Sequence, residues 1–270
     1  MSEEIETCPE MEVVMKQKNI TPKQIEILIL IYRFRFLNRI QIQTLLNHKD
    51  YKRINAWLKD LTDKHYLKRN YKRTLLNKNK PAIYYLGTKS ISLLKSFDVV
   101  NPKLLSRIYR EHLRSKKFID HCMTIGNLYL WFKNRVKDNQ LHFFAKTDLS
   151  LHDYLIQPIP DAYLSVESED SKRYFIELID EGVPRFAIRK RIQQYFEYFD
   201  DGVWQKTTGY AFPRILIVCH DKKLKNWLYG YLRNLLEDQD ELHPEISLSS
   251  SDLINDVNIN NKESIWQKVN

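Results

Sequence analysis

The spacing of hydrophobic residues between positions 21 and 64 predicts three helices. Thr21-Pro22 supplies an N-cap and a first-turn proline, and apolar residues then recur three and four positions apart as far as Tyr32. Asn38 is a suitable cap for a second helix over Arg39–Asn47, and a third helix is predicted over Tyr51–Lys64. The third helix has an apolar side and a polar side, so one face of it is expected to be exposed.

A strand pair and a closing helix are predicted directly after these helices. Residues 66–71 alternate between apolar and polar, residues 72–80 form a basic loop, and residues 81–86 are a second strand. Another helix begins at Gly87-Thr88. Three helices followed by a hairpin are typical of a winged helix-turn-helix, in which the third helix enters the major groove of DNA and the hairpin contacts the backbone.

The remainder of the chain alternates between strands and helices, which indicates an α/β domain with mixed strand pairing. The predicted helices cover residues 104–114, 116–137, 184–199 and 222–236, and the predicted strands cover residues 141–145, 159–166, 174–180, 214–219 and 245–248. The predicted fold class is therefore α/β (α+β), with an N-terminal winged helix-turn-helix and a mixed-sheet α/β domain. The expected organisation is an acidic leader at 1–19, a winged helix at 20–97, and a helical connector with the α/β domain at 98–270.

The charge of the chain is concentrated in the predicted winged helix. The whole chain of 270 residues carries +9, whereas residues 13–97 hold 19 basic and four acidic side chains. Residues 154–270 hold 14 basic and 19 acidic side chains and are acidic overall. A cationic module next to an acidic one favours double-stranded DNA as the partner of the first module. Solvated lysine-rich faces, or protein contacts made by a winged helix, are the alternative interpretations.

The predicted DNA contacts lie around the third helix and on the hairpin. Residues near the start of a recognition helix reach base edges, and basic residues on the wing neutralise phosphates. The predicted DNA-binding residues are Lys49, Lys52, Arg53, Asn55, Lys59, Arg69, Lys72, Arg73, Lys78 and Lys80.

Several other classes of protein are disfavoured by the sequence. The longest apolar stretch, Ile25–Tyr32, is too short to span a bilayer, and the N-terminal residues do not look like a secretory signal. The three cysteines are far apart and form no C-x-x-C pair. We therefore expect a cytoplasmic protein without a membrane partner, a disulfide framework or a thiolate zinc site.

Two carboxylates raise the question of nuclease chemistry. Pro160-Asp161 begins one predicted strand and Glu177 lies on the next, an arrangement that resembles the PD-(D/E)xK nuclease core. In that core the two acids hold Mg²⁺ for phosphodiester hydrolysis, and a lysine two residues after the second acid orients the water. Ile179 occupies the lysine position here, although Lys190 or Arg191 on the following helix could reach the site.

The candidate catalytic residues are thus Asp161, Glu177 and Lys190, and the candidate metal ligands are Asp161 and Glu177. The alternative is that Asp161 caps a turn and Glu177 pairs with a helix arginine such as Arg189. In that case no cofactor is expected, whereas an active site would require Mg²⁺.

The order of these features resembles the replication-relaxation family of plasmids and mobile elements, mainly of Gram-positive bacteria. The resemblance covers about residues 20–267, and its residues are the hairpin from Leu67 to Leu86, His121, Pro160-Asp161, Glu177, Asp180, Gly182, Arg191-Ile192, Tyr195 and Trp266. The chain departs from the family pattern in two places. The acids at the strand end, Glu177 and Asp180, are three residues apart rather than two, and the residue before Ile192 is arginine rather than lysine. The resemblance implies a role in plasmid replication and DNA relaxation.

Three functions are compatible with these observations. The leading hypothesis is a sequence-specific DNA-binding protein of a plasmid, phage or other mobile element, with an inactive nuclease-like domain used for assembly. The alternatives are a Mg²⁺-dependent endonuclease or nickase that uses Asp161 and Glu177, and a plain transcription regulator. A homodimer through the aromatic run at residues 195–199, and a replication or conjugation protein as partner, are further expectations.

Overall fold

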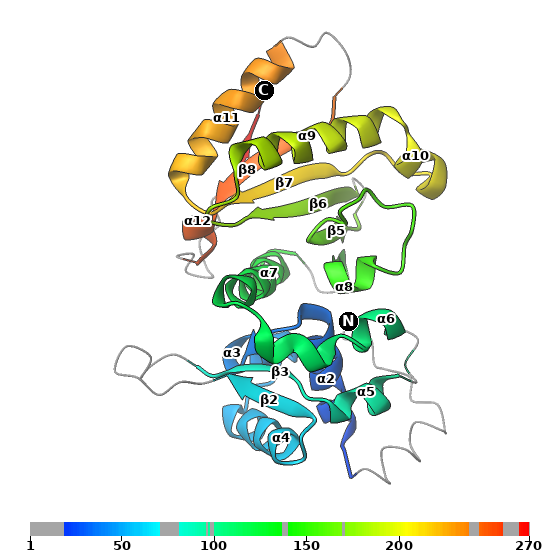
Figure 1. The fold of residues 1–270 in the computed structure, drawn as a ribbon, viewed down its shortest axis with the longest axis vertical. Helices are drawn as coiled ribbons and strands as arrows, with labels where there is room; N and C mark the ends of the chain where they lie inside the picture. The colour runs from blue at the N-terminus through cyan, green and yellow to red at the C-terminus, as the bar shows by residue number, and fades with distance from the viewer. Residues whose placement is uncertain are drawn as a thin grey trace. The chain divides into compact units, whose positions relative to one another are not determined.

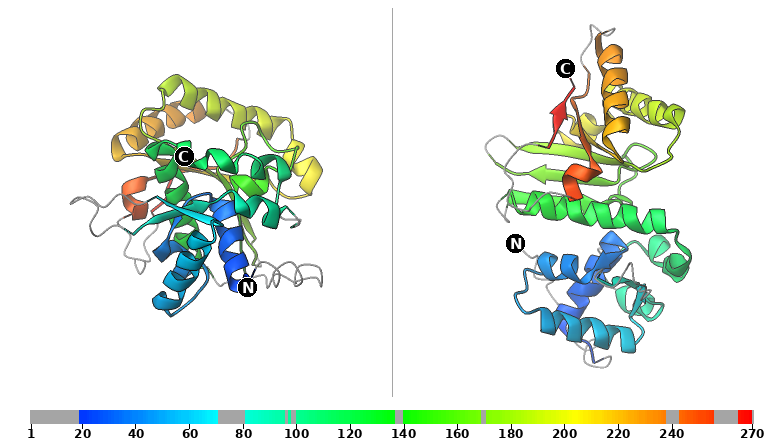
Figure 2. Two further views of the ribbon diagram at one scale, coloured as in Figure 1. Left: turned by 60° about the horizontal axis from the view of Figure 1, so that its bottom comes forward. Right: turned by 90° about the vertical axis from the view of Figure 1, so that its left-hand side faces the viewer.

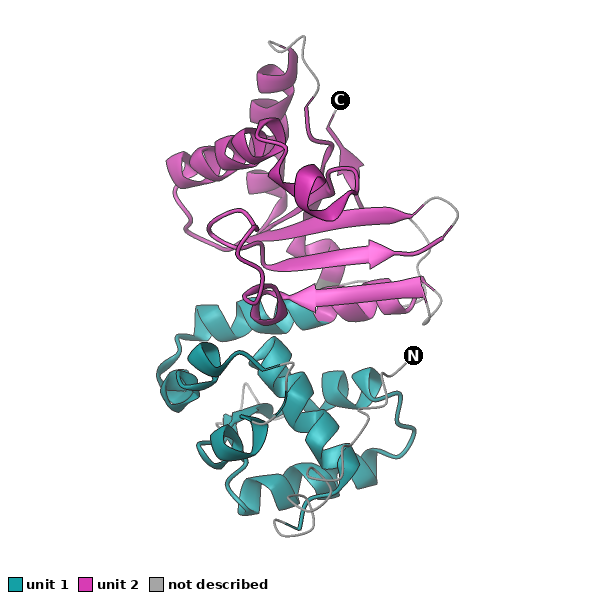
Figure 3. Cartoon of the chain, turned by 90° about the vertical axis from the view of Figure 1, so that its right-hand side faces the viewer, with its two compact units in different colours: residues 1–126 teal, residues 127–270 magenta. Residues whose placement is uncertain are grey.

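The structure is a computed structural model, and its described residues are 19–70, 81–95, 97, 100–136, 140–168, 171–237, 243–255 and 265–269. The chain divides into two units, Met1–Gly126 and Asn127–Asn270 (Figure 3). In the described part of the chain, no helix is both long enough and apolar enough to cross a membrane.

Unit 1 combines short helices with a small antiparallel sheet. Its helices are α2 (Pro22–Phe34), α3 (Arg39–Leu45), α4 (Tyr51–Asp63), α5 (Lys89–Leu94), α6 (Pro102–Leu105), the 3₁₀ helix η2 (Ile108–Leu113) and the first part of α7 (Lys116–Lys133). Its strands are β1 (Leu37–Asn38), β2 (Leu67–Asn70) and β3 (Ile83–Leu86), in the order β1-β3-β2. Figure 1 shows β2 beside α4, with β3 next to β2.

Local capping explains where the first helices of unit 1 begin. The Thr21 side chain accepts a hydrogen bond from the Gln24 backbone N–H, and the Gln24 side chain accepts one from the Thr21 backbone N–H, which forms a capping box at α2. Asn38 and Gln41 repeat this arrangement at α3. Asp50 caps α4 through the backbone N–H of Lys52. The predicted starts of these three helices agree with the structure.

Unit 1 differs from the sequence prediction in the helical segment before α7. A single helix was expected over residues 104–114, but the structure has α6 and then the separate 3₁₀ helix η2. Asn101 caps α6 by accepting hydrogen bonds from the backbone N–H groups of Lys103 and Leu104. Hydrophobic spacing cannot separate two such short turns from one helix, because both place apolar residues about three positions apart.

Unit 2 contains a six-stranded mixed sheet, so the predicted α/β class with mixed pairing is confirmed. The strands, in the spatial order β4-β5-β6-β7-β8-β9, are β4 (Leu141–Ala145), β5 (Ala162–Val166), β6 (Lys172–Ile179), β7 (Arg214–Cys219), β8 (Ile246–Ser250) and β9 (Gln267–Lys268). The pairs β6–β7 and β7–β8 are parallel, and the other pairs are antiparallel. The helices of the unit, besides the end of α7, are α8 (Lys146–Leu149), α9 (Arg185–Asp200), α10 (Val203–Thr208), α11 (Lys222–Glu237) and α12 (Ser251–Asn255).

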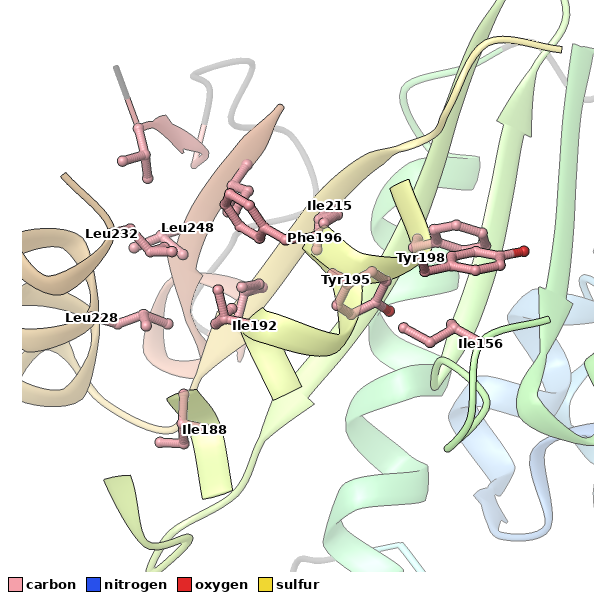
Figure 4. Close-up of a cluster of buried hydrophobic side chains, with 14 of the residues drawn as sticks. Ile156, Ile188, Ile192, Tyr195, Phe196, Tyr198, Ile215, Leu228, Leu232 and Leu248 are labelled. Carbon is pink, nitrogen blue, oxygen red and sulfur yellow. The ribbon is translucent and has the colours of Figure 1, made fainter. Parts of the chain in front are cut away.

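The main core of unit 2 lies between the sheet and the helices α9 and α11. Four residues of these helices are buried: Ile188 and Ile192 of α9, and Leu228 and Leu232 of α11. They share one cluster with strand residues such as Ile215 (Figure 4). The two helices lie side by side in each view of the ribbon (Figure 2). Because side chains alternate along a strand, residues of β6 with odd numbers face this core, and Glu177 is one of them.

Candidate functional site

Asp161 directly precedes β5 and Glu177 lies on the neighbouring strand β6, at the same level of the sheet. The register pairs Ala162 with Ile176, and the backbone N–H of Asp161 donates to the Ile176 carbonyl over 3.0 Å. Asp161 is 7% exposed, and the side chain of Glu177 is 15% exposed. The two predicted carboxylates therefore meet in a poorly hydrated environment, where unpaired negative charge is costly.

The Asp161 carboxylate is held by a lysine and by a backbone amide. Its Oδ1 lies 3.1 Å from Lys146 Nζ, and its Oδ2 accepts a hydrogen bond of 3.0 Å from the backbone N–H of Leu178. Lys146 begins α8 directly after β4, where Ala145 pairs with Ala162. The antiparallel pairing of β4 and β5 thus places residue 146 beside residue 161.

Lys146 was missed by the sequence reasoning, although both strands that position it were predicted. Knowing that residues 141–145 pair in register with residues 162–166 would have placed Lys146 beside Asp161. Hydrophobic alternation gives the face of each residue, but it does not give the partner strand or the register.

Glu177 is bound by two side chains from α9. Its Oε1 accepts a hydrogen bond of 3.1 Å from Arg191 Nε, and Arg191 Nη2 also contacts this oxygen. The hydroxyl of Tyr195 donates to the same oxygen over 2.6 Å. Arg191 and Tyr195 are four residues apart on one helix face, so the guanidinium also lies over the Tyr195 ring at 4.6 Å from its centroid.

Burial and charge shift the pKa values of all three groups. Burial raises the pKa of Glu177, the nearby Asp161 carboxylate raises it further, and the contacts with Arg191 and Tyr195 compensate only in part. Burial alone would lower the pKa of Arg191, but the Glu177 carboxylate reverses this and raises it. Burial and the Glu177 charge raise the pKa of Tyr195 well above its usual value. Tyr195 is therefore a neutral hydrogen-bond donor at physiological pH.

Lys190, the third predicted catalytic residue, lies on the exposed side of α9. In the described part of the chain it makes no hydrogen bond or ion pair. Its neighbour Arg191 points inward, with a side chain that is 17% exposed, and occupies the position facing Glu177. The helix arginine that pairs with Glu177 is thus Arg191 rather than Arg189, which lies over the Tyr231 ring.

The donor set around the two acids does not fit a magnesium ion. Mg²⁺ is bound in octahedral geometry by one or two carboxylates and several waters, so the carboxylate oxygens must be free to face the ion. Here Lys146 neutralises Asp161, and Arg191 neutralises Glu177. In the ranges that the structure describes, no group of three or more His, Cys, Asp or Glu side chains is arranged to hold a metal. We therefore derive no metal-dependent step at this site.

The predicted DNA-binding residues divide between exposed positions of unit 1 and a segment outside the described residues. Exposed positions are Lys49, Lys52, Arg53, Asn55, Lys59 and Arg69, all on α4, just before it, or on β2. The remaining four, Lys72, Arg73, Lys78 and Lys80, lie outside the described residues.

Trp57 organises the side chains near the start of α4. The Arg53 guanidinium lies 5.6 Å from the centroid of the Trp57 ring, and the His48 ring meets the same ring edge-on at 5.1 Å. Such contacts restrict a long side chain that would otherwise sample many rotamers. In the structure Trp57 is half-buried and supports Arg53.

A family model described as replication-relaxation matches residues 28–215, which is more than half of the chain. The chain belongs to the replication-relaxation family. The match spans most of α2 through the start of β7, so it includes both carboxylates, Lys146, Arg191 and Tyr195. The resemblance stated from the sequence is confirmed.

The comparisons with curated proteins and with solved structures do not change this family assignment. No curated protein matches this replication-relaxation protein. Among solved structures it is similar to one titled as the structure of restriction endonuclease FokI, with 11% identity and a TM-score of 0.34. That similarity covers 86% of this chain but only 43% of the FokI chain, so the chain spans less than half the length of that relative.

Proposed function

We propose that this member of the replication-relaxation family binds double-stranded DNA through unit 1 and acts in the replication or relaxation of a plasmid or another mobile element. Unit 2 serves in this proposal as an assembly module without nuclease activity. The observation that carries the DNA-binding half is the exposed basic face of α4 next to the β2–β3 hairpin.

The arrangement of unit 1 supports the interpretation as a winged helix. The helices α2, α3 and α4 precede the hairpin of β2 and β3, and β1 adds a third strand to the hairpin, as in winged helix-turn-helix modules. Ile54, Leu58 and Leu61 of α4 are fully buried, so the opposite side of this amphipathic helix is exposed. That side carries Lys52, Asn55 and Lys59, as a helix in the major groove requires.

The pairing of both acids in unit 2 supports an inactive nuclease-like core. A carboxylate that already accepts hydrogen bonds from arginine and tyrosine must lose them before it can bind a cation, and the desolvated arginine would then lie unpaired. Two ion pairs between strands and flanking helices instead fix α8 and α9 on the sheet. In this proposal the stiffened sheet supports assembly with a protein partner or with a second copy, as in the predicted homodimer.

Footprinting on the plasmid or element that encodes the protein tests the DNA-binding half. The wild type should protect a defined site, and Arg53→Ala should weaken binding at least tenfold. Lys89→Ala is the matched control, because Lys89 is an exposed lysine on α5 of the same unit. Equal effects of the two variants, or no affinity for duplex DNA at low salt, would contradict the proposal.

A nicking assay on supercoiled plasmid with Mg²⁺ tests the second half. We expect no relaxed product from the wild type, and footprints of Asp161→Ala that match those of the wild type. Nicking that Asp161→Ala abolishes would establish the endonuclease instead. Footprints without nicking at an origin would support a role in replication, and footprints only at a promoter would identify a transcription regulator.

A further inference from the structure

Unit 2 is acidic overall, yet two of its helices concentrate its basic residues. Eight of the 14 basic residues between positions 154 and 270 lie on α9 and α11, and neither residues 185–191 nor residues 222–233 contain an acid. These eight are Arg185, Arg189, Lys190, Arg191, Lys222, Lys223, Lys225 and Arg233. Arg191 pairs with Glu177 and Arg233 pairs with Glu237, so the other six are the cations that remain for a ligand. Surfaces that serve only solubility usually mix charges of both signs, so this segregation calls for a partner with negative charge.

Aromatic rings lie among these cations on the same two helices. Trp227 and Tyr231, one turn apart on α11, are nearly parallel, with an interplanar angle of 10° and centroids 6.0 Å apart. The Arg185 guanidinium of α9 lies over Trp227 at 4.8 Å, and that of Arg189 lies over Tyr231 at 5.9 Å. Two successive turns of α9 thus pair with two successive turns of α11 in the same way.

The exposure of these groups leaves them accessible to a ligand. Arg185, Arg189 and Lys190 are exposed, and Trp227 and Tyr231 are partly buried because their inner edges pack on the core. Phe186, beside Arg185, is 71% exposed. Among the described residues, no carboxylate forms an ion pair with Arg185, Arg189 or Lys190. The guanidinium donors that do not face the rings are therefore available to phosphate oxygens.

We propose that the α9–α11 face is a second nucleic-acid site, which binds a single strand of DNA. Arg185, Arg189 and the neighbouring lysines contact the phosphates, and the guanidinium and aromatic planes stack against bases. Sites for single strands characteristically combine a cationic track with flat aromatic groups, because every base has a π-face. A duplex hides its base faces, and the carboxylates of an acidic peptide offer no aromatic face, so neither uses the aromatic half of this surface.

A fluorescence-anisotropy titration with a labelled 20-mer of thymidine tests this site in the full-length protein. We expect Arg185→Ala/Arg189→Ala to weaken binding at least tenfold at 50 mM salt, and the loss to shrink as salt is raised. Lys172→Ala/Lys206→Ala is the matched control, because it removes two exposed lysines of the same unit that lie outside α9 and α11, and it should change binding less than twofold.

Two further measurements separate this site from unit 1 and from misfolding. Arg53→Ala should leave binding of the thymidine 20-mer within twofold, and the α9 double variant should leave duplex footprints unchanged. Trp227→Leu should weaken binding of the 20-mer while its thermal unfolding midpoint stays above the assay temperature. The proposal is overturned if the wild type does not bind the 20-mer, if the α9 and control variants lose equal affinity, or if the α9 variant affects duplex binding alone.

Discussion

Tyr195 donates its phenolic hydrogen to Glu177 across 2.6 Å, from a side chain with no exposed surface. The contact joins α9 to β6 at the point where Arg191 also approaches Glu177. A buried acid is tolerated in a core only when such donors surround it. The aromatic run at residues 195–199, which sequence reasoning considered for a dimer interface, therefore uses its first residue inside unit 2.

Removing the tyrosine hydroxyl should lower stability without changing the fold. We expect Tyr195→Phe to reduce the free energy of unfolding by about 1–3 kcal/mol, because a buried carboxylate oxygen loses a donor. Tyr198→Phe should cost less, since that hydroxyl donates to the neutral backbone carbonyl of Tyr154 over 3.2 Å. Urea unfolding of the two variants measures the difference, and an equal loss in both would contradict a special role for the Glu177 contact.

Replacing Arg191 should have a larger effect than replacing its neighbour on the helix. Arg191→Met leaves Glu177 as an uncompensated acid in a poorly hydrated site, and should cost about 2–4 kcal/mol of the free energy of unfolding. Lys190→Ala should change it by less than about 0.5 kcal/mol, because Lys190 is exposed. Similar losses of unfolding free energy in Arg191→Met and Lys190→Ala would mean that the ion pair between Arg191 and Glu177 does not stabilise unit 2.

The raised pKa of Glu177 predicts the sign of a pH effect. Burial, and then repulsion from Asp161, raise this pKa, so the folded state holds the proton more tightly than the unfolded state. The contribution of Glu177 to stability is therefore largest below the ordinary glutamate pKa, and it decreases as pH rises through the folded value. Subtracting the unfolding free energy of Glu177→Gln from that of the wild type isolates this contribution. The difference should fall as pH rises above the ordinary glutamate pKa of about 4.3, and a rise would show that the ion pair with Arg191 dominates.

Salt dependence distinguishes the roles proposed for residues of α4. If Lys59 neutralises a phosphate, Lys59→Ala should weaken binding to all duplexes alike and reduce the slope of log K against log salt by about 1. Asn55 carries no charge, so Asn55→Ala should leave the slope unchanged and reduce discrimination between the cognate site and its base-pair variants. Titrations at four salt concentrations with cognate and scrambled duplexes provide both quantities. An unchanged slope for Lys59→Ala would place that lysine away from the DNA backbone.

Sequence reasoning found the two carboxylates but not all of the side chains that bind them. Asp161 and Glu177 were identifiable because each lies on a predicted strand, and antiparallel pairing then brings them together. Lys146 depends on the register of β4 against β5, which no local pattern encodes. The helices α8 and α10 and the strand β9 were not predicted, because elements of two to six residues are too short to show a period.

Gly87 provides a test of the close approach between the end of β3 and the turn before β2. A Cβ atom at Gly87 would lie 2.4 Å from the backbone carbonyl oxygen of His65, and the Gly87 N–H donates to the Tyr66 carbonyl over 2.8 Å. Gly87→Ala should thus force the backbone apart and lower the free energy of unfolding by about 2 kcal/mol or more. Gly230 is the matched control, because it lies within α11 and a Cβ there would meet nothing within 4 Å. Gly230→Ala should raise the free energy of unfolding by about 0.5–1 kcal/mol, because alanine favours the helix more than glycine does. In thermal unfolding, the midpoint should therefore fall for Gly87→Ala and rise for Gly230→Ala, because only at Gly87 does the backbone block the added methyl group.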